Sequence, residues 1–140
     1  MAPCAQEAAE AAGDGDSVVG WKLDREQRKE LLQQFVPRYG VVDADHVTLR
    51  TRAAADCALP DETLGEILGR IDDGLGVEAM VVAIAGATDR PGGGTYHITW
   101  SLAPGREARE SNDVLAQREY TAFDLPMPVK LEPCCWSRGA

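Results

Sequence analysis

The chain has 140 residues, 44% of them hydrophobic, and this length suits one compact domain with little room for a second. Its formal net charge of −9 argues against a protein that coats long RNA or DNA, because such binding depends on clustered Lys and Arg. A local basic pocket for one phosphate or one RNA end is still compatible with this charge. No apolar run reaches the length of a membrane span.

Residues 1–16 read MAPCAQEAAEAAGDGD and contain four acids but no base. This composition predicts a disordered, acidic, Ala-rich tail ahead of a single domain over residues 17–140. The tail lacks the basic start and apolar centre of a signal peptide, so we expect a cytoplasmic protein without membrane contact. The four cysteines show no C-x-x-C spacing and are expected to be reduced thiols. We expect no metal site and no cofactor.

The first half of the domain alternates between expected strands and helices. Residues 17–23 are rich in apolar and β-branched residues and predict a strand. A helix over 24–36 follows, with Asp24 as the N-cap and Gln27 as its capping-box partner. Residues 45–51 alternate between polar and apolar and predict a second strand.

Residues 59–74 predict a second helix. The apolar residues Leu64, Ile67, Leu68 and Ile71 fall at i, i+3, i+4 and i+7, which is helical spacing. Pro60 and Asp61 suit its start and Gly74 suits its end.

The second half predicts mainly strands. Residues 77–85 and 95–102 read as strands joined by a Gly-rich loop at 86–94, which favours an antiparallel hairpin. A loop leading into a short helix is expected over 105–117, and a last short strand over 127–133. Pro126 and Pro128 restrict that strand to an edge. The order of elements predicts an α+β fold with mostly antiparallel pairing and flanking helices.

Both histidines of the chain occupy the same four-residue frame, HVTL at 46–49 and HITW at 97–100. In a strand, residues i and i+2 point to the same face, so His46 projects with Thr48, and His97 with Thr99. The apolar residues between them project the other way and can pack under helices. If the two strands are neighbours, two imidazoles and two hydroxyls meet in one cleft.

Such a cleft suits phosphodiester cleavage without a metal. One histidine can activate a nucleophile and the other can protonate the leaving oxygen, because the unperturbed pKa of His is about 6.5. The threonine hydroxyls can hydrogen-bond the non-bridging phosphate oxygens. A single H-x-T is usually structural. With seven Thr in 140 residues, chance places Thr at +2 after both histidines only about one time in 400.

The paired H-x-T motifs resemble those of the 2H phosphoesterase superfamily. Among its members, the chain looks most like the cyclic phosphodiesterase domain of plant and fungal tRNA ligases. This likeness also rests on GREARESND at 105–113, and it covers roughly residues 17–132. The chain departs from many members in the 51-residue spacing of its histidines and in having no ligase or kinase domain.

The resemblance implies a two-lobed 2H (2′-5′ RNA ligase-like) fold in which each lobe supplies one H-x-T. It also implies a metal-independent hydrolase that opens 2′,3′-cyclic phosphates, at RNA ends or on nucleotides, to 2′-phosphates, as in RNA processing and repair. The catalytic residues would be His46, Thr48, His97 and Thr99. By analogy, His97 would activate water and His46 would protonate the ribose oxygen. We expect a monomer that binds no DNA. Two alternatives stay open: a catalytically silent nucleotide- or partner-binding module, and an enzyme that trims RNA 3′ ends.

Five further residues are candidates for substrate binding. Arg50 and Arg106 lie near the two motifs and could neutralise phosphate, although arginines are more often solvated surface residues. Ser111 and Asn112 could contact the phosphate or sugar, or else one of them could N-cap a helix. Tyr96 could stack on a base, or pack in the core.

Overall fold

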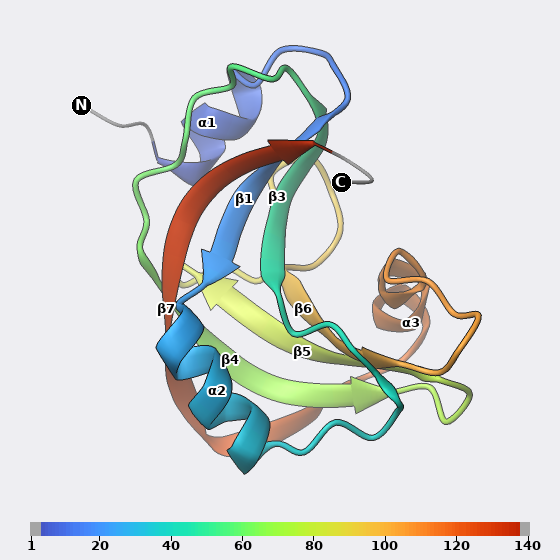
Figure 1. The fold of residues 1–140 in the computed structure, drawn as a ribbon. Coiled ribbons are helices and arrows are strands. Elements are labelled where there is room, and N and C mark those ends of the chain that lie inside the picture. Colours follow the sequence, from blue (N-terminus) through green and yellow to red (C-terminus); the bar gives the residue numbers. More distant parts are fainter. Residues whose placement is uncertain (1–3, 138–140) are drawn as a thin grey trace.

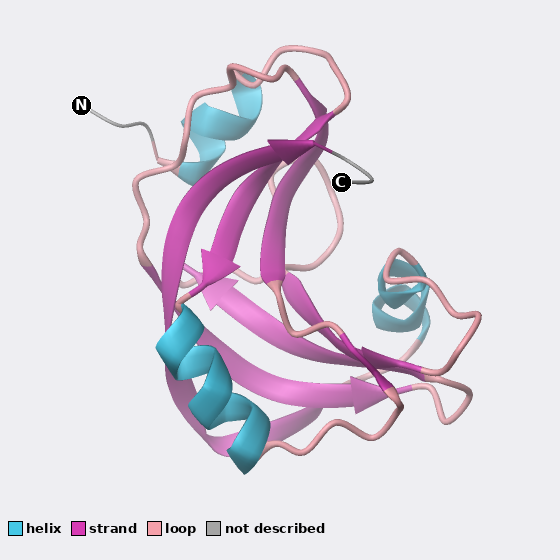
Figure 2. Ribbon diagram, in the orientation of Figure 1, coloured by secondary structure: helices cyan, strands magenta, loops and turns pink. Residues whose placement is uncertain are grey.

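The computed structural model describes residues 4–137, in which seven strands form one curled, half-barrel-like sheet in the order β2-β6-β5-β4-β7-β1-β3 (Figures 1 and 2). Every strand pairing is antiparallel. The strands are β1 (Ser17–Leu23), β2 (Val41–Val42), β3 (His46–Ala53), β4 (Leu64–Asp72), β5 (Val77–Ile84), β6 (His97–Leu102) and β7 (Thr121–Ser137). The helices are α1 (Ala5–Glu10), α2 (Arg25–Gln34) and α3 (Glu110–Gln117). The expected α+β class with mostly antiparallel strands is confirmed.

The long strand β7 joins the two halves of the sheet and arches along one side of the molecule (Figure 1). Residues 121–130 pair with β4, whereas residues 131–137 pair with β1. The prediction of a short edge strand at 127–133 is therefore wrong. Pro126 and Pro128 are tolerated because they lie in the half of β7 that pairs with β4 alone, so the missing N–H groups can face away from that partner.

The helix predicted over 59–74 is wrong, because most of this segment forms strand β4. Its burial alternates, with Gly65, Ile67, Gly69 and Ile71 inside and Leu64 exposed. Glycine disfavours a helix interior, whereas here it permits close packing of strands. A Cβ at Gly69 would lie 2.3 Å from the backbone oxygen of Thr121 on β7.

The structure also differs from the expected disordered tail, because Ala5–Glu10 form helix α1. The buried face of this segment consists of Ala5, Ala8, Ala9 and Ala12, which have helical spacing. The Ala5 N–H donates to Glu62 Oε2 at 3.0 Å, and the Ala54 N–H donates to the Ala12 oxygen at 3.0 Å. These bonds attach the segment to the loop between β3 and β4. Residues 1–3 lie outside the described residues.

Helix α2 begins as predicted. The Gln27 N–H donates to the Asp24 carboxylate at 2.9 Å, so Asp24 is the N-cap. The Gln27 side chain does not close a capping box. It donates to the Pro128 oxygen at 2.9 Å and accepts from the Lys130 N–H at 2.6 Å, which attaches α2 to β7.

The core fills the inside of the curled sheet. Its largest fully buried side chains include Trp21, Ile67, Met80, Ile98 and Trp100. Helix α3 packs on a second, smaller cluster, in which Val114 joins residues of β5.

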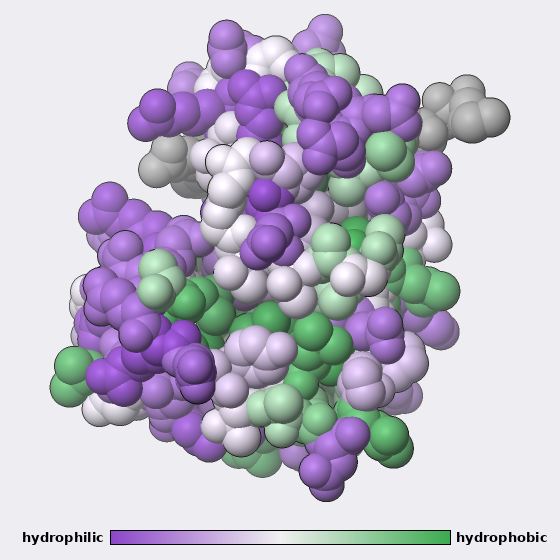
Figure 3. Space-filling view, turned by 180° about the vertical axis from the view of Figure 1, so that it is seen from behind, coloured by the Kyte–Doolittle hydropathy of each residue, from purple (hydrophilic) through white to green (hydrophobic). Residues whose placement is uncertain are grey.

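Part of the apolar surface is uncovered. Seen from behind, hydrophilic side chains cover most of the upper part of the molecule, and apolar side chains reach the surface in patches across the lower part (Figure 3). The exposed large apolar residues are Val36, Val41, Val42, Leu59, Leu64, Leu75, Tyr120 and Leu125. Among the described residues, none of the helices is both long and apolar enough to cross a membrane.

Candidate functional site

The two histidine frames meet where the curled sheet closes on itself. The segment before β3 runs antiparallel along β6, because the N–H groups of Asp43 and Ala44 donate to the oxygens of Trp100 and Thr99 at 3.0 and 2.8 Å. After Ala44, whose φ is +46°, the chain leaves β6, and the Asp45 oxygen accepts from the Leu23 N–H of β1. Strand β3 then turns toward β1 while its beginning stays beside β6 (Figure 1).

Both frames direct their polar residues away from the core. The intervening apolar residues Val47, Leu49, Ile98 and Trp100 are all buried in the main core cluster. Because side chains alternate along a strand, His46 and Thr48 point to the opposite face, as do His97 and Thr99. The two frames therefore present their polar side chains on the same outer face of the sheet.

Asp45 holds the ring of His46. Its carboxylate Oδ2 lies 3.1 Å from His46 Nδ1. Burial opposes ionisation of Asp45, but hydrogen bonds from Lys22, His46 and Arg25 outweigh it and lower its pKa to about 2. An ionised carboxylate can only accept, so His46 Nδ1 donates and Nε2 is the nitrogen presented away from Asp45. The ring of Trp136 packs edge-on, with centroids 4.9 Å apart.

His97 is held in a similar way by a neutral acceptor. Its Nδ1 lies 2.8 Å from the Thr95 backbone oxygen, which can only accept, so Nδ1 donates and Nε2 is again free of this contact. Burial lowers the pKa of His97 and outweighs this backbone hydrogen bond; the nearby charges of Arg90 and His46 lower it further. The neutral imidazole, with a lone pair on Nε2, is therefore the favoured form near neutral pH.

The two threonines have different surroundings. Thr99 is buried, donates to the Ala108 oxygen at 3.3 Å and lies 2.9 Å from Ser111 Oγ. Thr48 is half-buried, and its hydroxyl makes no hydrogen bond to protein within residues 4–137. Thr48 can therefore donate to a ligand directly, whereas Thr99 must first give up its bond to Ala108.

Two of the five substrate-binding candidates are not available for the predicted role. Tyr96 is buried, with its ring edge-on to Trp21 at 5.8 Å, so the prediction that it stacks on a base is wrong. Tyr96 and His97 are consecutive residues of an extended segment, so their side chains point to opposite faces, and the Tyr96 ring points into the core. Arg106 binds Asp73 and Glu110 at the β4–β5 turn, so the structure does not bring it to the histidines.

The other three candidates lie on the same side as the histidines or under them. Arg50 follows Thr48 on β3 and donates to the Ala9 oxygen at 2.9 Å and to Asp14 at 3.2 Å. Ser111 is fully buried and supports Thr99, whereas Asn112 is exposed. Neither caps α3, because the N-cap is Arg109.

Sequence reasoning missed Lys22, Asp45, Arg90 and Trp136. Asp45 directly precedes His46, and this adjacency was a usable signal. Lys22 pairs with His46 across β1 and β3, and its Nζ lies 4.3 Å from the ring centroid of Trp136. Trp136 and Arg90 reach the site only through the tertiary fold, so no local pattern marks them.

Within residues 4–137, no group of three or more His, Cys, Asp and Glu side chains is arranged to hold a metal ion. Comparison of the chain with family models, curated proteins and solved structures finds no match. The functional assignment therefore depends on the residues themselves.

Proposed function

We propose that the protein is a 2H phosphoesterase that opens 2′,3′-cyclic phosphates, at RNA ends or on nucleotides, to 2′-phosphates by acid–base catalysis with His46 and His97. The observation that carries the proposal is the matched presentation of the two imidazoles. Each donates its Nδ1 proton to a fixed protein acceptor, and among residues 4–137 neither Nε2 has a hydrogen-bond partner. A pair of oriented histidines is what proton transfer to and from a phosphodiester requires.

The surroundings of the histidines favour a division of roles. His97, whose pKa is lowered chiefly by burial, accepts a proton from the attacking water. His46 rests on the carboxylate of Asp45, which orients the ring and stabilises the imidazolium that donates to the ribose oxygen. Thr48 donates to a non-bridging oxygen, and Thr99 joins it when its hydroxyl rotates away from Ala108.

The two-lobed 2H architecture is part of this proposal. One lobe would be built on β1, β3 and the second half of β7. The other would be built on β4, β5 and β6. Each would contribute one H-x-T frame, and the two frames would come together where the start of β3 lies beside β6.

The decisive experiment is turnover of a cyclic phosphate without metal. The protein is incubated in excess EDTA with the four nucleoside 2′,3′-cyclic monophosphates and with a short RNA ending in a cyclic phosphate. We expect 2′-phosphate products, and a loss of at least about 100-fold in His46→Ala and His97→Ala, the typical range for one proton-transfer group. Thr48→Ala should lose activity, whereas Thr51→Ala, an exposed threonine of the same strand, should not. Full activity of either histidine variant, or strict dependence on added metal, contradicts the mechanism.

The burial of Thr99 favours the alternative of a silent binding module, because one of the four motif groups is already engaged by Ala108 and Ser111. Such a module would bind the cyclic nucleotide without turnover in the same assay. Shortening of the RNA by whole nucleotides would instead identify an enzyme that trims 3′ ends.

A further inference from the structure

Arg90 is a partly buried cation with few partners. It lies in the Gly-rich loop between β5 and β6, and within residues 4–137 no carboxylate comes within ion-pairing distance of it. Its Nε is buried without any hydrogen-bond partner in the described part of the chain. Among the described residues, its one side-chain hydrogen bond is a long one of 3.3 Å from Nη2 to Asn112 Oδ1.

The loop is folded around this guanidinium. The Arg90 N–H donates to the Gly94 oxygen at 2.9 Å, and the Gly93 N–H donates back to the Arg90 oxygen at 3.0 Å. Gly94 has a φ of +88°, and a Cβ there would lie 2.6 Å from Arg90 Nη2. Glycine at position 94 therefore both permits the turn and leaves room for the arginine side chain.

The other partly buried arginines in the described part of the chain are compensated. Arg70 binds the buried carboxylate of Glu78, and Arg106 binds Asp73. Arg28 donates to two backbone oxygens, those of Ala44 and Asp43. Arg90 loses hydration by burial without comparable compensation, although a guanidinium stays charged under all ordinary conditions. An uncompensated buried charge is costly, so an arginine in this state is best explained by an anion that binds to it.

The surroundings of Arg90 indicate which anion. Its Nη2 donates to Asn112 in the first turn of α3, and Ser111 of the same turn contacts Thr99, which shares a strand face with His97. The charge of Arg90 also contributes to the lowered pKa of His97. We infer that Arg90 binds a phosphate oxygen of the ligand beside His97, and that Gly94 is needed to leave space for it. The identity of the anion as a phosphate ester rests on the proposed function. Arginine suits this role because its planar fork can bind two phosphate oxygens at once.

Binding measured without turnover tests this inference. Adenosine 2′-monophosphate and inorganic phosphate are titrated by calorimetry into the wild-type protein and into Arg90→Gln, Arg90→Lys and Gly94→Ala. We expect Arg90→Gln to raise the Kd of adenosine 2′-monophosphate at least about tenfold, as for loss of one charged hydrogen bond. Gly94→Ala should weaken binding in the same direction, and Arg90→Lys by less than Arg90→Gln. Arg109→Gln, an exposed arginine at the start of α3, is the control and should bind within about twofold of wild type.

A Kd in Arg90→Gln equal to that of wild type overturns the inference. If Arg90→Gln does not fold, binding is followed by NMR of the wild-type protein instead. The Nε–H resonance of Arg90 is assigned as the one that is missing from the spectrum of Arg90→Lys, and its chemical shift is followed during titration. An unchanged resonance at saturating adenosine 2′-monophosphate is then the contrary result. Arg90-dependent binding without hydrolysis of any cyclic phosphate would retain this inference and reject the proposed function. Histidine-dependent hydrolysis with normal binding in Arg90→Gln would support the proposed function and reject this inference.

Discussion

The two histidines are equivalent in sequence but not in their contacts. His46 donates to the ionised carboxylate of Asp45, whereas His97 donates to a neutral backbone oxygen and has its pKa lowered chiefly by burial. The carboxylate of Asp45 fixes the orientation of the His46 ring, and burial favours the neutral imidazole of His97. Sequence symmetry alone could not assign the acid and the base, because the difference comes from residues outside the H-x-T frames.

The assignment of roles gives a test with leaving groups. On a substrate with a much better leaving group, such as a nitrophenyl phosphodiester, little protonation is needed. We expect His46→Ala to regain much of its lost rate on that substrate, while His97→Ala stays impaired, measured as kcat/KM for both substrates. Rescue of His97→Ala instead would exchange the two roles.

The pH dependence follows from the lowered pKa of His97. A base whose pKa is below its usual value of 6.5 stays neutral to lower pH, so the acid limb of kcat/KM should have its midpoint below 6.5. The full profile should be bell-shaped, with two apparent pKa values that belong to the pair. A profile that is flat between about pH 5 and 9, where unperturbed histidine titrates, would exclude acid–base catalysis by these residues.

At the scale of elements, strand β4 shows why sequence periodicity was insufficient. Leu64, Ile67, Leu68 and Ile71 fit a helix, but the pattern that the fold uses is the alternation of Gly65, Ile67, Gly69 and Ile71. Glycines carry no hydrophobic signal, so half of the buried face was invisible to a search for apolar residues. The strands that carry the two H-x-T frames, β3 and β6, were predicted correctly because β-branched and aromatic residues mark them.

Gly69 gives a direct test of this packing. In Gly69→Ala the new Cβ would lie 2.3 Å from the Thr121 oxygen and 2.5 Å from the Tyr120 ring, so β4 and β7 must separate locally. We expect the free energy of unfolding to fall by about 1–3 kcal/mol, the usual cost of overpacking, in urea denaturation. Gly40→Ala is the control, because a Cβ there meets nothing within 4 Å. Equal stability of the two variants would contradict the close approach of the strands.

Helix α1 was missed because the alanines of a short, acidic, Gly-containing segment are compatible both with a helix and with a disordered tail. Its tertiary contacts stabilise it, since a six-residue helix is too short to be stable alone. Ala8→Gln places a polar side chain at a fully buried position and should lower the unfolding free energy by about 1–3 kcal/mol. Ala11→Gln, at an exposed position of the same segment, should change it by less than about 0.5 kcal/mol. Equal unfolding midpoints would indicate that α1 does not dock.

At the scale of the whole molecule, ionisation links stability to pH in two ranges. His97 has a lowered pKa in the folded state, chiefly through burial, so below about 6.5 the unfolded chain binds a proton that the folded chain does not, and stability falls. The pKa values of Asp72 and Asp73 are also lowered, because hydrogen bonds to their carboxylates outweigh burial. Their contribution is present above about 3.8 and is lost as pH falls below it. Urea midpoints at several pH values should decline in both ranges, and His97→Ala should flatten the decline near pH 6.

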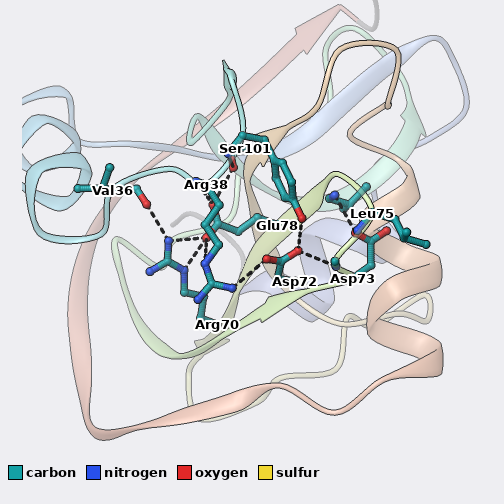
Figure 4. A network of polar contacts seen from close by, with 11 residues as sticks. Val36, Arg38, Arg70, Asp72, Asp73, Leu75, Glu78 and Ser101 are labelled. Carbon is teal, nitrogen blue, oxygen red and sulfur yellow. Dashed lines mark hydrogen bonds and ion pairs between the residues drawn. The ribbon is translucent and has the colours of Figure 1, made fainter.

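A carboxylate that no sequence pattern marked stabilises the sheet where β4, β5 and β6 meet the segment after α2. Glu78 of β5 is fully buried and accepts from Ser101 Oγ at 2.7 Å and from the Arg38 N–H at 3.1 Å, while Arg70 binds its other oxygen (Figure 4). The ion pair and hydrogen bonds connect β4, β5 and β6 with the segment after α2. An apolar strand containing one glutamate gives no hint that its partners come from three other segments.

Neutralising this carboxylate tests how far the sheet depends on it. Glu78→Gln keeps the shape but leaves the half-buried Arg70 without its counter-charge, and breaking a buried pair in this way typically costs about 3–5 kcal/mol. We expect the thermal and urea transitions to fall accordingly, whereas Glu66→Gln, at an exposed position of β4, should change stability little. The double variant Glu78→Gln with Arg70→Met should recover part of the loss, because most of the cost comes from the unpaired charge and not from the absence of the pair. Stability of Glu78→Gln equal to that of Glu66→Gln would mean that water already compensates Arg70.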